Sequence, residues 1–418
     1  MTARGIVRVP GDKSISHRAL ILGSIANGKS KIRGILRSAD VMSTAGVLRS
    51  LGSSVPDLSE SLELGGLGLG GLRAPGSSLD AGNSGTTVRL MSGLVAAHAF
   101  TSRFEGDASL SRRPMKRIAE PLTAMGATFE FARGDGLPMT IHGGNLAGIS
   151  WDTRAASAQT KSAILMAGVA ARVPVSVRES HKSRDHTERM LSSMGVHVQT
   201  DESSVRISPV ASLTPLDITV PGDPSSAAYI VALGVLRRSG EVEVPDVCVN
   251  ATRTGFVDTL AAMGADVEYR DRVSAAGDDA ATIVARPSTL GDFTVEGDSV
   301  ASMIDELPLL ACVAAAAGVS LEVTGAGELR VKESDRIGTV VENLIAIGAQ
   351  AEELPDGFRV FGDRRPLAGR VRTGGDHRIA MSFGVLGALQ GNAIVIDDPD
   401  CVGVSYPRFW DDIAGLGS

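Results

Sequence analysis

The sequence has 418 residues, 43% of them hydrophobic and only 4% aromatic, and a formal net charge of −7. A chain of this length is too long for one core and suits two domains, and its acidic balance argues against nucleic acid as the main partner. Because aromatic residues are few, small aliphatic side chains must fill the core, which predicts closely packed helices.

The cysteines, histidines and apolar runs of the sequence argue against a disulfide framework, a metal site, a signal peptide and a membrane span. Cys248, Cys312 and Cys401 are odd in number and widely spaced, so we expect neither a disulfide framework nor a zinc site. His181 and His186 lack a helical spacing for a metal. Charges interrupt the first apolar run, which argues against a signal peptide, and no stretch has the length of a membrane span. A cytoplasmic protein with no membrane partner is expected.

Six helix-like stretches end in an apolar residue followed by glycine, at nearly constant spacing. These glycines lie 74, 69, 69, 84 and 69 residues apart. Glycine just past a helix is a C-cap signal, because it adopts the left-handed conformation without a Cβ clash. Six evenly spaced caps predict six copies of one supersecondary unit. The glycines are Gly52, Gly126, Gly195, Gly264, Gly348 and Gly417.

A second repeat divides the chain in two. The segment VPGDKS at 9–14 recurs as VPGDPS at 220–225, which places the two glycines 211 residues apart. Pro-Gly pairs are turn and breaker signals. Two unrelated turns would look the same, but the even division of the six units favours two crossings between two halves. We therefore predict domains at 11–221 and at 222–418 plus 1–10, with three units each.

Each unit opens with a polar segment that leads into an apolar run of small residues. A helix that is apolar on nearly all faces is buried, so these runs are expected to form the inner layer. Short pieces rich in β-branched residues follow, and then an amphipathic helix that ends at the glycine. The pattern predicts an α/β fold of two domains, each with three repeated βαβαββ-type units and buried parallel helices.

Polar and charged residues gather in and near the first turns of the buried helices. Parallel helix N-termini present free N–H groups and a partial positive charge, which together bind anions. Ser225, Ser226 and Ser302 can equally be ordinary N-caps, and both interpretations stay open. Capping does not account for the basic residues, so we expect an anion-binding site. The basic residues are Lys13, Arg18, Arg89, Arg113, Lys332, Arg336 and Arg378.

Two acidic segments are candidates for acid–base chemistry. Asp305-Glu306 stands at the start of a buried run, and Glu333 lies between Lys332 and Arg336. Carboxylates mixed with fixed cations near a desolvated site are able to transfer protons. Solvated helix starts with paired charges would give the same pattern, so position alone leaves both interpretations open.

Eight motifs follow one another along the chain: PGDKSISHR (10–18), LDAGNSGTTVRL (79–90), RRPM (112–115), SAQTKSA (157–163), SRDHTE (183–188), DELP (305–308), KESDR (332–336) and DHRIAMSF (376–383). In this order they resemble the EPSP synthase (3-phosphoshikimate 1-carboxyvinyltransferase) family of enolpyruvyl transferases. The likeness covers essentially the whole chain. It implies an inside-out α/β barrel of two domains with threefold units, joined by two crossings, which agrees with the repeat count.

The resemblance implies a reaction. The enolpyruvyl group of phosphoenolpyruvate is transferred to the 5-hydroxyl of shikimate 3-phosphate, and phosphate is released through a tetrahedral ketal. In this family the step belongs to the shikimate pathway of aromatic amino acid biosynthesis, needs neither metal nor organic cofactor, and is blocked by glyphosate. Both substrates are polyanions, as the cationic helix ends require. We expect a monomer whose partners are these two small molecules.

The same resemblance implies roles for individual residues. Shikimate 3-phosphate is expected to contact Lys13, Ser14, Arg18, Ser157, Ala158, Gln159, Ser183, Arg184, Asp305 and Lys332. Phosphoenolpyruvate is expected to contact Lys13, Gly85, Arg113, Gln159, Arg336 and Arg378. Asp305 is the expected base for the 5-hydroxyl, and Glu333 the expected proton donor to the methylene, with Lys13 as a second candidate. Asp12 and Asp376 are expected to orient cations or to cap helices.

Two departures and two alternatives accompany this hypothesis. Ala158 stands where some members have Ser, and Val404 stands where some have Lys, which removes one anion contact. The sister enzymes that use UDP-N-acetylglucosamine carry a reactive Cys on a loop, and the corresponding residues 106–115 contain none. A non-catalytic repeat protein that binds anions is the alternative from a different class.

Overall fold

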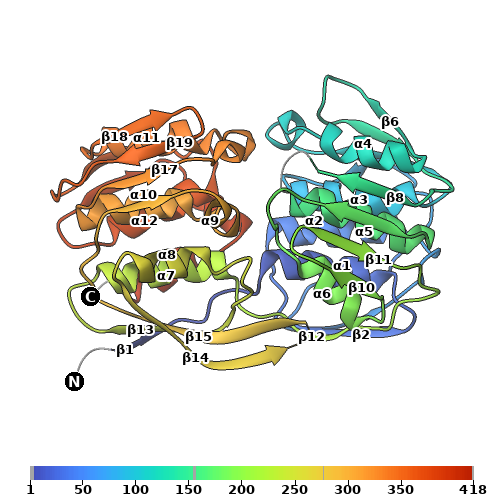
Figure 1. The fold of residues 1–418 in the computed structure, drawn as a ribbon, viewed down its shortest axis with the longest axis horizontal. Helices are drawn as coiled ribbons and strands as arrows, with labels where there is room; N and C mark the ends of the chain where they lie inside the picture. Colours follow the sequence, from blue (N-terminus) through green and yellow to red (C-terminus); the bar gives the residue numbers. More distant parts are fainter. Residues whose placement is uncertain (1–3, 154–156, 276, 417–418) are drawn as a thin grey trace. The chain divides into compact units, whose positions relative to one another are not determined.

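The chain folds into two compact units (Figure 1). The computed structural model describes residues 4–153, 157–275 and 277–416. The N-terminal unit comprises Gly11–Val220 with Ser274–Asp278, and the C-terminal unit comprises Met1–Pro10, Pro221–Val273 and Asp279–Ser418. The second crossing thus lies one residue before the position expected from the repeat, and residues 274–278 group with the N-terminal unit, which the repeat pattern did not indicate.

The N-terminal unit contains three repeats in succession. The first has α1 (Lys13–Ser24), β2 (Lys29–Arg33), α2 (Ala39–Ser50) and β3 (Ser61–Gly65). The second has β4 (Leu79–Asp80), α3 (Gly85–Ala96), β5 (Thr101–Glu105), a 3₁₀ turn η1 (Leu110–Arg112), α4 (Lys116–Met125), β6 (Thr128–Phe131) and β7 (Met139–His142). The third has β8 (Ile149–Asp152), α5 (Ala158–Ala171), β9 (Val175–Arg178), α6 (His186–Ser193), β10 (Val198–Thr200) and β11 (Ser204–Ile207), and β12 (Asp217–Thr219) follows it.

The C-terminal unit contains the other three repeats and begins with β1 (Arg4–Ile6). The fourth repeat has α7 (Pro224–Leu236), β13 (Glu241–Cys248), α8 (Gly255–Ala262), β14 (Asp266–Ala275) and β15 (Asp278–Arg286). The fifth has β16 (Phe293–Val295), α9 (Asp298–Ser302), α10 (Leu307–Ala317), β17 (Leu321–Val323), η2 (Gly327–Val331), α11 (Arg336–Ala346), β18 (Ala351–Leu354) and β19 (Gly357–Val360). The sixth has β20 (Ala368–Val371), α12 (His377–Gly387), β21 (Ala393–Ile396), η3 (Pro399–Val404) and α13 (Phe409–Ala414).

Most of the sheets share one topology. Over the described residues the strands form six sheets, and four of them have the order first, second, fourth and third strand of the repeat, as in β4-β5-β7-β6. The first two strands pair in parallel, as β4 with β5, and the later strands are antiparallel, as β7 with β5 and with β6. A helix therefore connects the parallel pair, which is the βαβ arrangement that parallel strands require. The predicted βαβαββ-type repeat is confirmed in these four sheets, whereas the first and sixth repeats have fewer strands in the described residues.

Two strands lie far along the chain from the sheets that they join. The first repeat has no leading strand of its own, and β12 pairs in parallel with β2 in its place. The fourth repeat likewise takes β1 from the beginning of the chain, which pairs in parallel with β13. Each of these strands lies just before a Pro-Gly crossing: β1 precedes the first crossing and β12 precedes the second. Each unit is completed by a strand from the segment that precedes or follows its three repeats.

The apolar runs form the buried helices, as predicted. Every residue of α7 from Pro224 to Val235 is buried, and α1, α3, α5, α10 and α12 are buried along most of their length. In the C-terminal unit α7, α10 and α12 pack against one another, and Figure 1 shows the sheet of β17 to β19 and the hairpin β14–β15 on opposite sides of them. None of the helices in the described part of the chain is long and apolar enough to cross a membrane.

Five of the six predicted glycine marks have the expected left-handed backbone. Their φ angles are 92° at Gly52, 121° at Gly126, 92° at Gly195, 101° at Gly264 and 97° at Gly348. The sixth, Gly417, lies outside the described residues. The regular spacing of these glycines therefore reflects a backbone requirement, because residues other than glycine adopt this conformation only with strain.

Small residues allow the buried helices of the N-terminal unit to approach backbone to backbone. In α3, a Cβ added at Gly93 would lie 2.1 Å from the carbonyl oxygen of Ala163 in α5. A backbone oxygen in a packed helix has no room to withdraw, so Gly93 is required by packing rather than by its own φ. Gly46, in the half-exposed middle of α2, has no atom within 4 Å of the same added Cβ.

These two helical glycines give a matched prediction. Gly93→Ala should lower the free energy of unfolding by about 1–3 kcal/mol, because the added methyl overpacks the α3–α5 contact. Gly46→Ala should leave it unchanged or raise it by about 0.5–1 kcal/mol, because alanine has the better helix propensity and meets nothing. Urea unfolding of both variants measures the difference. Equal stability of the two variants would contradict the close packing described here.

Candidate active site

The buried helices of the N-terminal unit begin at polar caps beside the predicted site residues. Asp12 caps α1 by accepting from the Ile15 N–H at 2.8 Å, Ser84 caps α3, and Ser157 caps α5. Lys13, Gly85 and Ala158 are the first residues of these three helices. The expected capping role of Asp12 is confirmed. The remaining N–H groups of the first turns provide the partial positive charge that favours anions.

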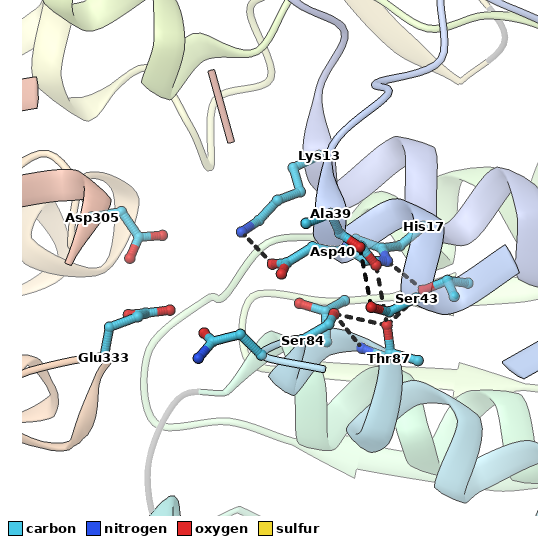
Figure 2. Close-up of polar contacts among 12 residues, drawn as sticks. Lys13, His17, Ala39, Asp40, Ser43, Ser84, Thr87, Asp305 and Glu333 are labelled. Carbon is cyan, nitrogen blue, oxygen red and sulfur yellow. Dashed lines mark hydrogen bonds and ion pairs between the residues drawn. The ribbon is translucent and has the colours of Figure 1, made fainter. Parts of the chain in front are cut away.

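Lys13 is held by a carboxylate that the sequence did not indicate. Its Nζ lies 2.8 Å from Oδ2 of Asp40, in the first turn of α2, and Figure 2 shows the two side chains directed toward each other. Asp40 is buried. An aspartate at a helix start carries no distinguishing sequence signal, since it fits the helix dipole wherever it occurs. The pair fixes the position of the ammonium group that the family resemblance assigns to both substrates.

Arg18 is buried and held by neutral acceptors. Its Nε donates to Thr187 Oγ1 at 2.6 Å, its Nη1 to the Ser14 carbonyl at 2.9 Å, and its Nη2 to Ser162 Oγ at 2.8 Å. Burial is the main cause that lowers the pKa of Arg18, to about 10, so the guanidinium stays charged near neutrality. A buried charge that is hydrogen-bonded to neutral oxygens attracts an external anion strongly.

The N-terminus of α3 lies between two guanidinium groups. A Cβ added at Gly85 would lie 3.0 Å from Nη1 of Arg89 and 3.4 Å from Nη1 of Arg113. Arg113 Nη2 also donates to Oδ1 of Asn83 at 2.8 Å. Both arginines are buried. The sequence placed Arg113 and Gly85 in the site but left Arg89 as an unassigned cation, although its spacing of one turn from Gly85 is a usable signal.

The loop before α6 contains Ser183 and Arg184. Ser183 Oγ donates to Glu179 Oε1 at 2.6 Å, and Glu179 Oε2 accepts from Lys161 Nζ at 2.7 Å. Because the serine hydrogen is committed to a buried carboxylate, Ser183 is left as an acceptor only. The half-buried Arg184 is therefore the better anion ligand of the two residues that the sequence analysis proposed. Ser157 keeps its hydroxyl hydrogen, because as a cap its oxygen accepts from Thr160.

The C-terminal unit has its own charged cluster, centred on Arg336. The guanidinium donates to Oδ2 of Asp376 at 2.8 Å through Nε, to Oδ1 of Asp305 at 3.1 Å through Nη1, and to Oε2 of Glu333 at 2.6 Å through Nη2. Lys332 Nζ lies 3.5 Å from the same oxygen of Asp305. The two predicted acid–base residues, Asp305 and Glu333, therefore share one buried cation, and Figure 2 includes both of them.

Ion pairing sets the charge state of this cluster. Burial alone would lower the pKa of Arg336, but Asp376, Glu333 and Asp305 raise it above its usual range. Burial would likewise raise the pKa of Asp376, but the Arg336 charge lowers it below its ordinary value. Asp376 also caps α12 by accepting from the Arg378 N–H at 2.9 Å. The expectation that Asp376 orients a cation and caps a helix is confirmed.

Arg378 lies beside a second buried carboxylate. Its Nη1 is 3.6 Å from Oε1 of Glu306, too far for a hydrogen bond, and has no other hydrogen-bond acceptor among the described residues. Glu306 accepts from the hydroxyl of Ser225, which in turn accepts from Arg253 Nη2 at 2.8 Å. Ser225 is thus part of a buried chain, and Asp223 is the cap of α7. Glu306 was mentioned together with Asp305 in the sequence analysis but was assigned no role.

His17 is a buried imidazole next to two of the cations. Its Nδ1 lies 2.7 Å from Oγ1 of Thr44, which is 2.7 Å from Oγ1 of Thr87, and Figure 2 labels His17 and Thr87. Burial lowers the pKa of His17 well below its usual value, and the charges of Lys13 and Arg18 lower it further. The ring is therefore neutral in the folded protein at pH 7.

The structure is thus an α/β fold in which polar caps and cations lie at the N-termini of buried helices and carboxylates lie beside fixed cations. A family model described as EPSP synthase (3-phosphoshikimate 1-carboxyvinyltransferase) matches residues 2–413. The chain belongs to the EPSP synthase family.

Relatives and solved structures agree with this assignment. The chain is 46% identical over 415 residues to the 3-phosphoshikimate 1-carboxyvinyltransferase of Sulfurihydrogenibium sp. (strain YO3AOP1), covering 98% of this chain and 96% of the relative. It is 40% identical over 417 residues to the Bacillus subtilis (strain 168) protein of the same name, covering 99% and 97%. An EPSP synthase structure from Acinetobacter baumannii superposes with a TM-score of 0.87 at 38% identity, covering 100% of this chain and 96% of that one.

His17 gives a prediction for the pH dependence of stability. In the unfolded chain this histidine binds a proton below about pH 6.5, whereas in the folded protein its lowered pKa shifts proton binding to a lower pH. The free energy of unfolding should therefore fall as the pH is lowered from about 6.5, by at most about 1.4 kcal/mol per pH unit from this residue. His17→Gln should have a shallower slope between pH 7 and pH 5 in urea unfolding. Parallel slopes for the two proteins would show that His17 does protonate in place.

Proposed function

We propose that the chain transfers the enolpyruvyl group of phosphoenolpyruvate to the 5-hydroxyl of shikimate 3-phosphate, with release of phosphate. The full-length family match carries this proposal. In support, the basic motif residues lie in or beside the first turns of the buried helices or in loops next to them. Polyanionic substrates suit such a site because helix N-termini and guanidinium groups both favour phosphate and carboxylate.

In this proposal the N-terminal unit provides most of the shikimate 3-phosphate contacts. Arg18 and Ser14 hold the carboxylate, with the guanidinium fixed in place by Thr187 and Ser162. The phosphate takes the hydroxyl hydrogen of Ser157 and the backbone N–H of Ala158. The remaining proposed contacts are Arg184 in preference to Ser183, Gln159 along the ring, and Lys13, Asp305 and Lys332.

The phosphoenolpyruvate contacts come from both units in the proposal. Its phosphate lies at the N-terminus of α3, where Gly85, Lys13 and Arg113 provide N–H groups and positive charge. Gln159 is a further contact. Its carboxylate is held by Arg336 and Arg378, whose planar guanidinium groups match a carboxylate. The C-terminal unit, 222–418 plus 1–10 in the predicted division, would thus complete the phosphoenolpyruvate site.

Asp305 is proposed as the base for the 5-hydroxyl and Glu333 as the donor to the methylene carbon, with Lys13 as a second candidate for the donor. Both carboxylates accept from Arg336 in the structure. A substrate carboxylate that takes the Nη1 donor of Arg336 competes directly with Asp305. The incoming anion would therefore free the base at the moment when it is needed, while the fixed cations stabilise the charge of the ketal.

The proposal also includes the setting of the reaction. The resemblance implies a cytoplasmic monomer of the shikimate pathway that works without a metal or an organic cofactor. A direct test is phosphate release with shikimate 3-phosphate and phosphoenolpyruvate, with either substrate omitted as control. Release only with UDP-N-acetylglucosamine as acceptor would assign the chain to the sister reaction, and anion binding without release would make it a binding protein.

Asp305→Ala should lower turnover by about 10²-fold or more, as expected for loss of a general base. Binding of shikimate 3-phosphate, measured by calorimetry, should remain, because the other proposed contacts are unchanged. Asp258→Ala, at an exposed position of α8, is the matched control and should keep full turnover. Turnover of the Asp305 variant at the level of its parent would remove Asp305 from the mechanism.

Gly85→Ala addresses inhibition by glyphosate, which is longer than phosphoenolpyruvate. The added methyl would lie 3.0 Å from Arg89 Nη1 and 3.4 Å from Arg113 Nη1, in the space between them. We expect the parent to be sensitive, and the variant to lose glyphosate affinity by more than it loses phosphoenolpyruvate affinity, because the longer ligand has less room to shift. Inhibition curves against phosphoenolpyruvate for both proteins decide this. An insensitive parent, or a variant as sensitive as its parent, would contradict it.

A further inference from the structure

A hydrogen-bonded link crosses between the starts of α3 and α5. Arg89 Nη1, on α3, donates to Oε1 of Gln159, on α5, at 2.7 Å. Gln159 Nε2 donates in turn to Oγ1 of Thr86, back on α3, at 3.0 Å. Arg89 Nη2 is 3.4 Å from the Pro114 carbonyl oxygen. The glutamine amide is thus held at both ends by residues that lie three positions apart on one helix.

The chemistry of arginine determines which way this amide faces. A guanidinium has five N–H donors and no acceptor, so only the amide oxygen of Gln159 can face Arg89. The amide nitrogen must then lie on the opposite side, where one of its two hydrogens goes to Thr86. The second hydrogen is left for a ligand, because Gln159 is only half-buried. Without Arg89 the amide could rotate by half a turn and still bond the Thr86 hydroxyl, which is able to donate as well as accept.

The link stands next to the position proposed for the phosphate of phosphoenolpyruvate. The same Arg89 Nη1 that bonds Gln159 lies 3.0 Å from the Cβ position of Gly85, the first residue of α3. A phosphate there gains from an N–H donor and is repelled by a carbonyl oxygen. We propose that Arg89 is a positioning residue that fixes the Gln159 amide so that its N–H, and not its oxygen, faces the phosphate of phosphoenolpyruvate. This inference rests on the proposed function.

A purely structural role for Arg89 is disfavoured by the way the two helices pack. Farther along α3, Gly93 is in backbone contact with Ala163 of α5, since an added Cβ would come within 2.1 Å of the Ala163 oxygen. Both helices are buried along most of their length, so apolar packing holds them together without the polar link at their N-terminal ends. Loss of the link should therefore change the site more than the fold.

The test is a double-mutant cycle read separately for the two substrates. Arg89→Met keeps an unbranched side chain of nearly the same course and removes the donors, and Gln159→Ala removes the amide. We expect Arg89→Met to lower kcat/KM for phosphoenolpyruvate by about 30-fold, the scale of one hydrogen bond to a charged group, with a smaller effect on KM for shikimate 3-phosphate. The double variant should be no worse than Gln159→Ala alone, because Arg89 acts through the glutamine.

A conservative variant and a surface control are added to the double-mutant cycle. Arg89→Lys should recover most of the activity, since an ammonium group is also a donor only and keeps the amide oriented. Arg103→Ala, an exposed arginine of β5 paired with Glu105, should behave as wild type.

Three results would overturn the positioning role. They are full activity of Arg89→Met, losses that multiply in the double variant, and an equal loss for both substrates together with a lower thermal midpoint. A wild-type chain that releases no phosphate would refute the proposed function and this role with it. An active wild type with an unaffected Arg89→Met refutes the positioning role alone.

Discussion

Helices that are buried along most of their length, with charged side chains in or near their first turns, impose the main constraint on this molecule. The first N–H groups of such a helix need acceptors, and the nearby cations need counter-charges, in places where water does not compensate them. The chain meets the first need with Asp or Ser caps on α1, α3, α5, α7 and α12. It meets the second with carboxylates from another segment of the same repeat, such as Asp40 for Lys13 and Asp305 for Arg336. The polar layer at the helix starts is therefore a requirement of folding before it is a site for chemistry.

The two units solve the problem of a buried arginine in opposite ways. Arg18 is bonded to two hydroxyls and a carbonyl, and burial lowers its pKa to about 10. Arg336 is bonded to three carboxylates, which raise its pKa above the usual range although burial opposes them. An anion that approaches Arg18 meets a guanidinium that donates to hydroxyl and carbonyl oxygens, whereas one that approaches Arg336 must compete with protein carboxylates. An arginine held like Arg18 is suited to bind a substrate anion, whereas one held like Arg336 is suited to release a protein carboxylate when the substrate anion binds.

Sequence reasoning predicted the features that depend on local order and missed those that depend on contacts between separate elements. The glycine period, the buried runs and the caps at Asp12 and Asp376 are local signals, and the structure confirms them. The motifs also marked the clusters around Gly85 and Arg336. Asp40 and Glu179 were missed, because nothing near them in the chain shows that they meet Lys13 and Ser183. The bond of Arg89 to Gln159 joins residues 70 positions apart, which no periodicity can reveal.

Because β1 pairs with β13, the C-terminal unit is not one uninterrupted stretch of polypeptide. A cut between residues 220 and 221 would separate β1 from its partner β13, because β1 precedes the cut and the rest of its sheet follows it. The downstream fragment would then expose the edge of β13, with its backbone donors and acceptors open to any extended strand. Two fragments divided at this point would be complementary pieces of a split protein, and recovery of the C-terminal unit would depend on returning a strand of only three residues.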